Sequence, residues 1–305
     1  MSERVLITGC GGMLGLSTYH NAVEKYGKDN VLATDIDLNE TWLSPLDVRE
    51  ISEVKKVFGE FKPSLVLHLA ALTDLEYCEK EQEDAWLTNA LGTENVALLA
   101  REYDATMVYI STAGIFGGEK EYYTDFDTPN PLSYYAKSKY HGEQFVERFV
   151  PKYYVFRAGW MMGGGTAKDK KFINKIYKQI KDGKKKLHVV DDKLGTPTYT
   201  NDFSSSILKV VDIGLYGLYN QVCNGSASRY DVAKKLVELL KLENEIEVEK
   251  VDSDYFKEEY FAPRPPSEKL LNTKLNKRSI NFMRDWEECL QDYVKEFHAD
   301  YYGEK

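Results

Sequence analysis

Tyr135 and Lys139 are the residues of this 305-residue sequence whose chemistry is most readily inferred. They stand four positions apart in Tyr135-Ala-Lys-Ser-Lys139, so a helix would place the phenol and the ammonium on one face. A free tyrosine titrates near ~10, and a neighbouring cation favours the phenolate. Such a tyrosine acts as a general acid toward a carbonyl oxygen that receives hydride, or as the base in reverse. Most pairs with this spacing are ordinary surface pairs, so a second feature must support the interpretation.

Thr112 provides that second feature. It lies in Ile110-Ser-Thr-Ala-Gly-Ile-Phe-Gly117, at the end of an apolar run that is typical of a strand. Its hydroxyl is expected to bind the same substrate oxygen as the phenol of Tyr135. The sequence therefore predicts a catalytic group of Thr112, Tyr135 and Lys139.

A glycine-rich turn follows the first apolar run of the chain. Gly9, Gly12 and Gly15 form a G-x-x-G-x-x-G pattern, because Leu14 stands where G-x-G-x-x-G would need glycine. A strand that ends in such a turn exposes N–H groups at a helix N-terminus, which favours a pyrophosphate. The alternative is a tight strand-to-helix turn without a ligand. We expect Gly9, Gly12, Met13 and Leu14 to contact a dinucleotide cofactor.

Asp35 is the expected partner of the cofactor's ribose. It follows Gly15 by twenty residues at the end of the second expected strand, where its carboxylate would accept hydrogen bonds from a 2′-hydroxyl. No Arg or Lys lies in the glycine turn or directly after Asp35, so NAD(H) is favoured and NADP(H) is the alternative. Further expected cofactor contacts are Asp47 and Val48, near the adenine, and the small residues Ala70 and Ala71.

Alternating apolar runs and amphipathic stretches predict that an α/β fold, a Rossmann-type doubly wound parallel sheet, positions these residues. Expected strands are 4–8, 31–34, 65–69, 107–111 and 154–157, and expected helices include 17–26, 51–58 and 85–103. We expect an NAD(P)-binding domain over residues 1–160, with a return contribution from about 188–212. Residues 161–305 mostly form a smaller C-terminal substrate-binding domain. The lysines from 168 to 186 are expected on a solvated helix face, with a substrate-phosphate cradle as the alternative.

The composition excludes several classes of function. A net charge of −9 argues against nucleic-acid binding, because the phosphate backbone favours excess Lys and Arg. Four cysteines without metal-ligand spacing predict neither a metal site nor a disulfide framework. No apolar run is long enough to span a membrane, and no secretory signal is recognisable, so we expect a cytoplasmic protein without a membrane partner.

Taken together, these motifs resemble the extended short-chain dehydrogenase/reductase family. The resemblance to its dTDP-4-dehydrorhamnose reductase-like branch rests on Tyr135 to Glu143, Phe156-Arg-Ala-Gly-Trp160, Val190 to Thr198 and Ala262-Pro-Arg-Pro265. It implies reduction of a 4-keto sugar nucleotide by NAD(P)H. Tyr135 would then donate the proton, Lys139 would hold the ribose and lower the tyrosine's pKa, and Thr112 would orient the carbonyl. The implied contacts on the substrate side are Thr73, Asn89, Trp160 and Arg264. Asn89 also matches the family's helix asparagine that supports the active site, with an ordinary polar helix residue as the alternative.

One departure from the branch leaves the sugar open. Ala113 and Gly114 stand where the relatives commonly carry Asp-Tyr, which also argues against a 4,6-dehydratase because that reaction needs acidic residues there. Two alternatives remain. One is an NAD-dependent sugar-nucleotide 4-epimerase, and the other is a non-enzymatic regulatory subunit resembling the methionine adenosyltransferase β subunit. The family also implies a homodimer.

Overall fold

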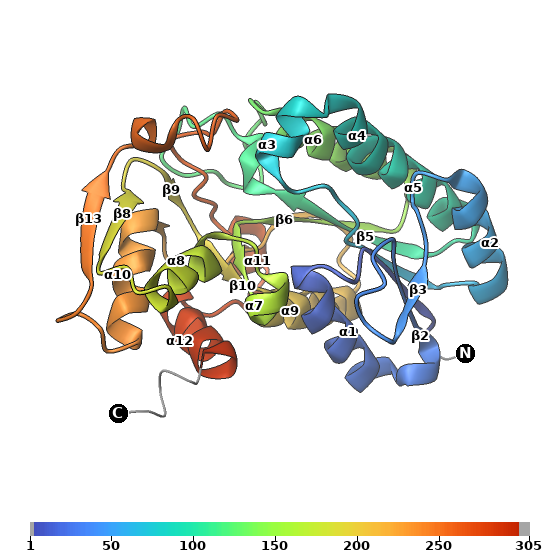
Figure 1. The fold of residues 1–305 in the computed structure, drawn as a ribbon. Helices are drawn as coiled ribbons and strands as arrows, with labels where there is room; N and C mark the ends of the chain where they lie inside the picture. The colour runs from blue at the N-terminus through green and yellow to red at the C-terminus, as the bar shows by residue number, and fades with distance from the viewer. Residues whose placement is uncertain (1–2, 299–305) are drawn as a thin grey trace.

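A parallel sheet covered by helices on both faces forms the larger part of the molecule (Figure 1). The computed structural model describes residues 3–298. Within that range the sheet has seven strands in the order β11-β6-β5-β4-β1-β2-β3. The strands are β1 (Val5–Thr8), β2 (Val31–Asp35), β3 (Leu43–Pro45), β4 (Leu65–His68), β5 (Thr106–Thr112), β6 (Tyr153–Ala158) and β11 (Gly217–Asn220). All five expected strands and the doubly wound sheet are confirmed, while the short strands β3 and β11 were missed.

Side chains alternate between two apolar layers because both faces of the sheet are buried. Val5 and Ile7 face one layer, and Leu6 faces the other. Figure 1 shows α2 and α3 to α6 over one face and α1 and α9 under the other. These helices are α1 (Met13–Tyr26), α2 (Ile51–Phe61), α3 (Leu75–Lys80), α4 (Gln82–Trp86), α5 (Gly92–Glu102), α6 (Tyr134–Phe149) and α9 (Thr200–Ile213).

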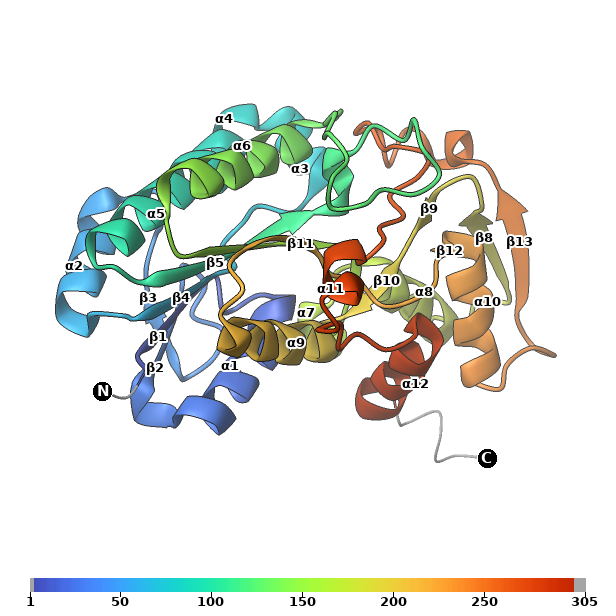
Figure 2. The same cartoon turned by 180° about the vertical axis from the view of Figure 1, so that it is seen from behind.

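A smaller unit lies beside the carboxyl ends of the strands (Figure 2). Its elements include three two-stranded sheets, β7 with β10, β9 with β12, and β8 with β13. The bounds are β7 (Trp160–Met162), α7 (Gly165–Lys168), α8 (Phe172–Lys181), β8 (Lys186–Val190), β9 (Leu194–Gly195), β10 (Pro197–Tyr199), β12 (Ala227–Ser228), α10 (Arg229–Leu239), β13 (Glu247–Val251), α11 (Thr273–Lys277) and α12 (Trp286–Phe297).

The segment that returns to the larger unit overlaps the expected 188–212 only in part, over α9. Strand β8 pairs with β13, so it belongs to the smaller unit. Helix α9 packs on α1, where Lys25 Nζ donates to the carbonyl oxygen of Leu208 at 3.0 Å, and β11 pairs with β6. The return contribution is therefore α9 and β11, because hydrogen bonding rather than hydrophobic pattern decides where these short segments pair.

Candidate active site

Thr112 and Tyr135 meet at the carboxyl end of β5. Thr112 is the last residue of β5, and its Oγ1 accepts a hydrogen bond from the backbone N–H of Gly114 at 3.1 Å. Tyr135 lies in the first turn of α6, which Ser133 caps through a hydrogen bond from the Ala136 N–H at 3.2 Å. The Thr112 hydroxyl lies near enough to the Tyr135 phenol to lower its pKa by hydrogen bonding. Two of the three predicted catalytic residues are thus in contact.

Helix α6 can approach the sheet closely because residue 142 is glycine. A Cβ there would stand 2.6 Å from the Tyr109 hydroxyl oxygen and 3.0 Å from the Asn89 carbonyl oxygen. Tyr109, in β5, in turn donates its hydroxyl to the carbonyl oxygen of Lys139 at 2.8 Å. These contacts fix the distance between α6 and β5, and with it the position of the catalytic helix face.

Lys139 is buried, with 4% of its surface exposed. Its Nζ lies 4.2 Å from the centre of the Tyr109 ring, a cation–π contact. Burial lowers the pKa of Lys139 to about 7, and the nearby charge of Glu143 opposes that shift. The ammonium is therefore held in place at a cost, as is common in functional sites.

The pKa of Tyr135 differs from the expectation. Burial raises it to about 12, the hydrogen bond with Thr112 partly opposes the rise, and the charge of Glu268 adds to it. The expected lowering by Lys139 is therefore wrong for the chain as described, because desolvation of the phenolate is the largest effect. Tyr135 is a protonated acid at neutral pH.

A buried ion pair behind Lys139 was missed at the sequence level. Arg157 Nη2 donates to Glu143 Oε1 at 2.5 Å, and Ser111 Oγ donates to Glu143 Oε2 at 2.6 Å. Both charged side chains are almost fully buried. Glu143 follows Lys139 by four residues, so the helical spacing Tyr135, Lys139, Glu143 was the signal that could have found it.

Asn89 supports the site from below and does not face a substrate. It is fully buried in the π-helical turn Leu87–Leu91. Its Oδ1 accepts from the Leu72 N–H at 2.8 Å, and its Nδ2 donates to the Leu72 carbonyl oxygen at 3.0 Å and to Ser138 Oγ at 3.1 Å. Its assignment as a substrate contact is therefore corrected: Asn89 ties the segment after β4 to α6.

The glycine turn brings β1, β4 and α1 together. Gly9 has a φ of +68°, and a Cβ there would stand 2.3 Å from the Ala70 Cα. A Cβ at Gly15 would stand 2.0 Å from the Cys10 carbonyl oxygen. At Gly12 a Cβ would make only an ordinary contact, 3.6 Å from the Gly9 carbonyl oxygen, and this residue is exposed. Gly9 and Gly15 therefore permit the turn, and Gly12 leaves room above it.

The N-terminus of α1 fits the phosphates of a dinucleotide. Gly12 is its N-cap without a side-chain hydrogen bond, and its first turn, which begins at Met13 and Leu14, contains no acidic residue. The first backbone N–H groups of this 14-residue helix have no capping side chain, so they can donate to an external acceptor. Ala70 and Ala71, both partly buried, follow β4 beside this opening, at the switch point of the sheet.

Asp35 is the last residue of β2, and its carboxylate lies against the glycine turn. Its Oδ2 accepts from the Gly11 N–H at 2.8 Å, and its Oδ1 accepts from the Asp37 N–H at 2.9 Å. Gly11 was not among the expected cofactor residues. A Cβ there would stand 3.0 Å from Asp35 Oδ2, so glycine allows the carboxylate this position.

Lys168 also reaches the glycine turn, which the sequence pattern did not reveal. From α7 its Nζ donates to the Gly11 carbonyl oxygen at 3.1 Å and to Asn39 Oδ1 at 2.9 Å, and it pairs with Glu40 at 3.0 Å. The expected solvated face is therefore wrong for Lys168. The argument for NAD(H) from a lack of nearby cations loses its basis, because the smaller unit supplies one.

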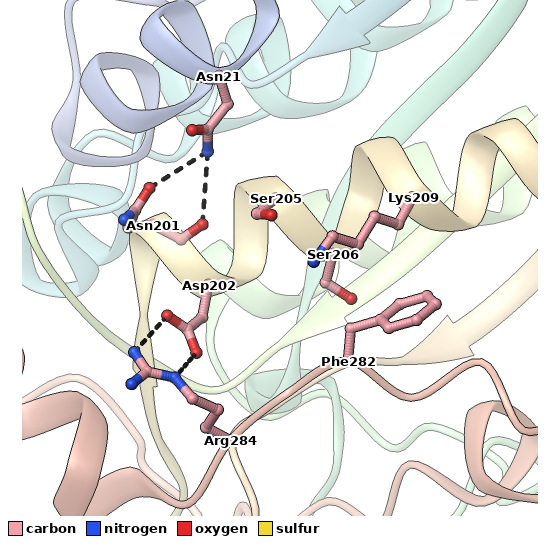
Figure 3. A pocket seen from close by; sticks show the side chains of 8 residues that line it. All are labelled: Asn21, Asn201, Asp202, Ser205, Ser206, Lys209, Phe282 and Arg284. Atoms are coloured by element: carbon pink, nitrogen blue, oxygen red, sulfur yellow. Dashed lines mark hydrogen bonds and ion pairs between the residues drawn. The ribbon is translucent and has the colours of Figure 1, made fainter. Parts of the chain in front are cut away.

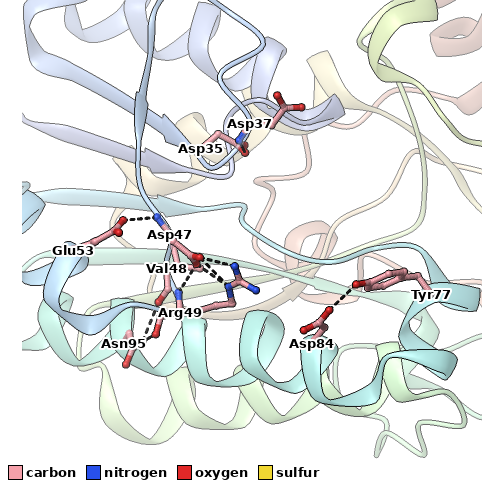
Figure 4. A network of polar contacts seen from close by, with 9 residues as sticks. All are labelled: Asp35, Asp37, Asp47, Val48, Arg49, Glu53, Tyr77, Asp84 and Asn95. Carbon is pink, nitrogen blue, oxygen red and sulfur yellow. Dashed lines mark hydrogen bonds and ion pairs between the residues drawn. The ribbon is translucent and has the colours of Figure 1, made fainter.

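Asp47 and Val48 are engaged with their own surroundings (Figure 4). Arg49 Nη2 donates to Asp47 Oδ2 at 2.6 Å, and this hydrogen bond lowers the pKa of Asp47. The Val48 carbonyl oxygen accepts from Asn95 Nδ2 at 2.9 Å. Their contact with an adenine stays a prediction.

Two contacts join the larger unit to the smaller one near the site. Lys171 Nζ donates to the carbonyl oxygen of Thr73 at 2.8 Å, and Arg264 Nη1 pairs with Glu76 Oε1 at 2.7 Å. Burial lowers the pKa of Lys171, so this lysine also departs from the expected solvated face. Thr73 and Arg264 thus lie at the boundary between the units, and their contact with a substrate stays a prediction.

Trp160, the first residue of β7, lies on the side of the site formed by the smaller unit. Its Nε1 donates to Glu268 Oε2 at 2.5 Å, and the Arg229 guanidinium lies 3.6 Å above its ring. A Cβ at Gly195 would stand 2.3 Å from the indole, so glycine there makes room for it. Glu268 and Arg229 carried no motif that could have marked them in the sequence.

A hollow of about 320 Å³ between α1, α9 and the segment before α12 contains none of the expected site residues (Figure 3). Two of its charged side chains pair with each other, because Arg284 Nε and Nη2 both donate to Asp202 at 2.8 Å. Over residues 3–298, no group of three or more His, Cys, Asp or Glu could hold a metal ion, and no helix is long and apolar enough to cross a membrane.

Comparisons with known proteins agree with this geometry. The family model of the RmlD substrate binding domain matches residues 3–299. A dTDP-4-dehydrorhamnose reductase from Mycolicibacterium smegmatis is 32% identical over 298 residues, which cover 96% of this chain and 86% of that protein. The crystal structure of a dTDP-4-dehydrorhamnose reductase from Clostridium acetobutylicum is 34% identical with a TM-score of 0.87, covering 96% and 99% of the two chains. A Bacillus anthracis dTDP-4-dehydrorhamnose reductase in complex with NADP is 32% identical with a TM-score of 0.86, covering 97% and 100%.

Proposed function

The chain belongs to the RmlD substrate binding domain family, and on that basis we propose that it reduces the 4-ketone of a 6-deoxy sugar nucleotide with NAD(P)H. The observation that carries the proposal is the meeting of Thr112 and Tyr135 at the end of β5, with Lys139 on the same helix face. The dTDP-linked 4-keto-6-deoxy sugars named for its relatives are the proposed substrates.

The protonation states suit reduction. Tyr135, with a pKa of about 12, holds the proton that the ketone oxygen must receive. Thr112 Oγ1 accepts the Gly114 N–H, and its hydroxyl hydrogen would turn from Tyr135 to the substrate oxygen when a ketone binds. When bound, the reduced nicotinamide supplies the hydride. Lys139 lies on the same helix face, and its protonated form would favour negative charge developing on oxygen.

The cofactor-binding residues follow from the same geometry. The N–H groups at Gly12, Met13 and Leu14 are proposed to hold the pyrophosphate, and Asp35 the adenosine ribose. Lys168 beside Asp35 gives this end of the site both signs of charge. We therefore propose that the protein accepts NADPH as well as NADH.

Turnover tests the proposal directly. Purified protein is mixed with NADH or NADPH and dTDP-4-dehydrorhamnose, and loss of the reduced nicotinamide is followed by absorbance. We expect Tyr135→Phe to lose roughly 10²–10⁴-fold in rate, the usual contribution of a positioned acid. Tyr134→Phe is the matched control, because Tyr134 is the adjacent residue and engages Glu79 only through its backbone N–H.

Other results would favour the other functions. Interconversion of sugar nucleotides without net loss of cofactor would favour a 4-epimerase. Cofactor binding with no turnover of any 4-keto sugar nucleotide, and a Tyr135→Phe variant indistinguishable from wild type, would favour a regulatory nucleotide-binding role. The homodimer remains an expectation that light scattering tests.

A further inference from the structure

Glu268 closes over the catalytic threonine from the smaller unit. A Cβ at Gly114 would stand 3.2 Å from Glu268 Oε1 and 3.5 Å from Thr112 Oγ1. The two oxygens therefore flank one point in space, which Gly114 leaves open because it has no side chain. The charge of Glu268 is also close enough to raise the pKa of Tyr135.

The Glu268 carboxylate is fixed in this position. Trp160 Nε1 donates to its Oε2 at 2.5 Å, and its own backbone N–H donates to the Leu194 carbonyl oxygen at 2.8 Å. The preceding residue, Ser267, donates its hydroxyl to the Glu121 carbonyl oxygen at 2.6 Å. Hydrogen bonds thus fix both the Glu268 side chain and the backbone around it, and a functional group held in this way can recognise a ligand selectively.

Its second oxygen is left for a ligand. Among residues 3–298, no donor forms a hydrogen bond with Glu268 Oε1, and the side chain is only partly buried. Arg229 lies over the Trp160 ring and balances the Glu268 charge. Burial lowers the pKa of Arg229 to about 10, and the Glu268 charge opposes that shift. An ionised carboxylate oxygen accepts hydrogen bonds and donates none, so the matching ligand group is a hydroxyl or amine.

We propose that Glu268 is a specificity-determining residue whose Oε1 accepts a hydrogen bond from the sugar hydroxyl next to the ketone. The assignment rests on the proposed function, which places the ketone oxygen at Thr112 and Tyr135. The group nearest that oxygen on the sugar ring is the hydroxyl of the adjacent carbon, and Glu268 lies beside Thr112. The preferred substrate class is a keto sugar with that hydroxyl free, and a sugar deoxygenated there is disfavoured.

The test compares two ligands and three proteins. The dissociation constants of dTDP-4-dehydrorhamnose and of its 3-deoxy analogue are measured by calorimetry, with oxidised cofactor present to prevent turnover. The proteins are wild type, Glu268→Gln and Glu121→Gln. Glu268→Gln keeps the side-chain volume and an oxygen that can accept the Trp160 N–H, but it removes the negative charge of the carboxylate. Glu121 is the control, because its exposed carboxylate pairs with Lys269 on the same wall.

We expect Glu268→Gln to weaken binding of the hydroxylated sugar roughly 10- to 100-fold, as for a hydrogen bond to a charged group. The 3-deoxy analogue should bind wild type and Glu268→Gln alike, and Glu121→Gln should match wild type. Equal weakening of both ligands would mean that Glu268 only supports the wall, and unchanged binding of both would also overturn the inference. Failure of the proposed function looks different: wild type would bind neither keto sugar, or would bind them without oxidising NADH when the reduced cofactor is supplied.

Discussion

Replacing Lys139 by methionine should remove activity and stabilise the fold. The side chain is 4% exposed, and its pKa is lowered from 10.5 to about 7. At about 1.4 kcal/mol per pKa unit, that difference corresponds to about 5 kcal/mol of unfavourable burial while the group is charged. Methionine keeps the length and the contact with the Tyr109 ring. Because replacement of buried charges by apolar groups gains about 1–4 kcal/mol, we expect Lys139→Met to gain about 2–4 kcal/mol near pH ~6.

The gain in the free energy of unfolding for Lys139→Met should decrease as the pH rises. Between about 7 and 10.5 the folded state binds fewer protons at Lys139 than the unfolded state does. The free energy of unfolding of the wild type therefore rises with pH through this window because of this group. The difference between Lys139→Met and wild type should be full below pH ~7 and should disappear by about pH 10.

Urea denaturation of both proteins across this pH range measures the difference. Lys137→Met is the control, because Lys137 is an exposed lysine on the same helix, and its difference from wild type should be small throughout. A Lys139→Met difference that is constant with pH, or that favours the wild type below pH ~7, would refute the assigned burial cost.

Three further predictions test the supports around the site. Asn89→Ala leaves the Leu72 N–H and carbonyl oxygen without their partner, so it should cost roughly 2–4 kcal/mol in urea denaturation and lower kcat more than it raises KM; a cost under about 0.5 kcal/mol would contradict the supporting role. Lys168 Nζ lies at the glycine turn, where it could pair with a 2′-phosphate, so Lys168→Ala should raise the KM for NADPH roughly tenfold more than that for NADH. Equal losses for both cofactors would argue for a structural role alone. Glu76→Gln removes the carboxylate paired with Arg264, so the KM for the sugar nucleotide should fall by roughly 2- to 5-fold if that arginine binds the diphosphate; a rise would contradict the prediction.

The parts of the site that are local in sequence could be predicted. Gly9 to Leu14 lie within one strand-turn-helix unit, and Tyr135 and Lys139 lie on one helix, so short patterns specify them. The position of Thr112 could be predicted because it ends a run of β-branched and apolar residues that is typical of a strand. Four of the five expected strands, β1, β4, β5 and β6, were found for the same reason, since each is a mostly buried apolar run.

The remainder depends on tertiary contacts that no local pattern records. Lys168 reaches the glycine turn from more than 150 residues away, and Glu268 reaches Gly114 over a similar distance in sequence. The burial of Tyr135, which sets the direction of its pKa, is likewise a property of the folded site. A supporting role for Asn89 was implied by the family resemblance, but only the fold shows that its side chain binds the Leu72 backbone.

Transfer of a deuterium label tests the central claim most directly. NADPH deuterated at the transferable position is incubated with dTDP-4-dehydrorhamnose, and the product is analysed by mass spectrometry and NMR. We predict one deuterium at C4 of the reduced sugar for wild type and Tyr134→Phe, and almost none for Tyr135→Phe in the same time. A reduced or rearranged sugar without deuterium at C4, or equal labelling by Tyr135→Phe, would contradict reduction by this site.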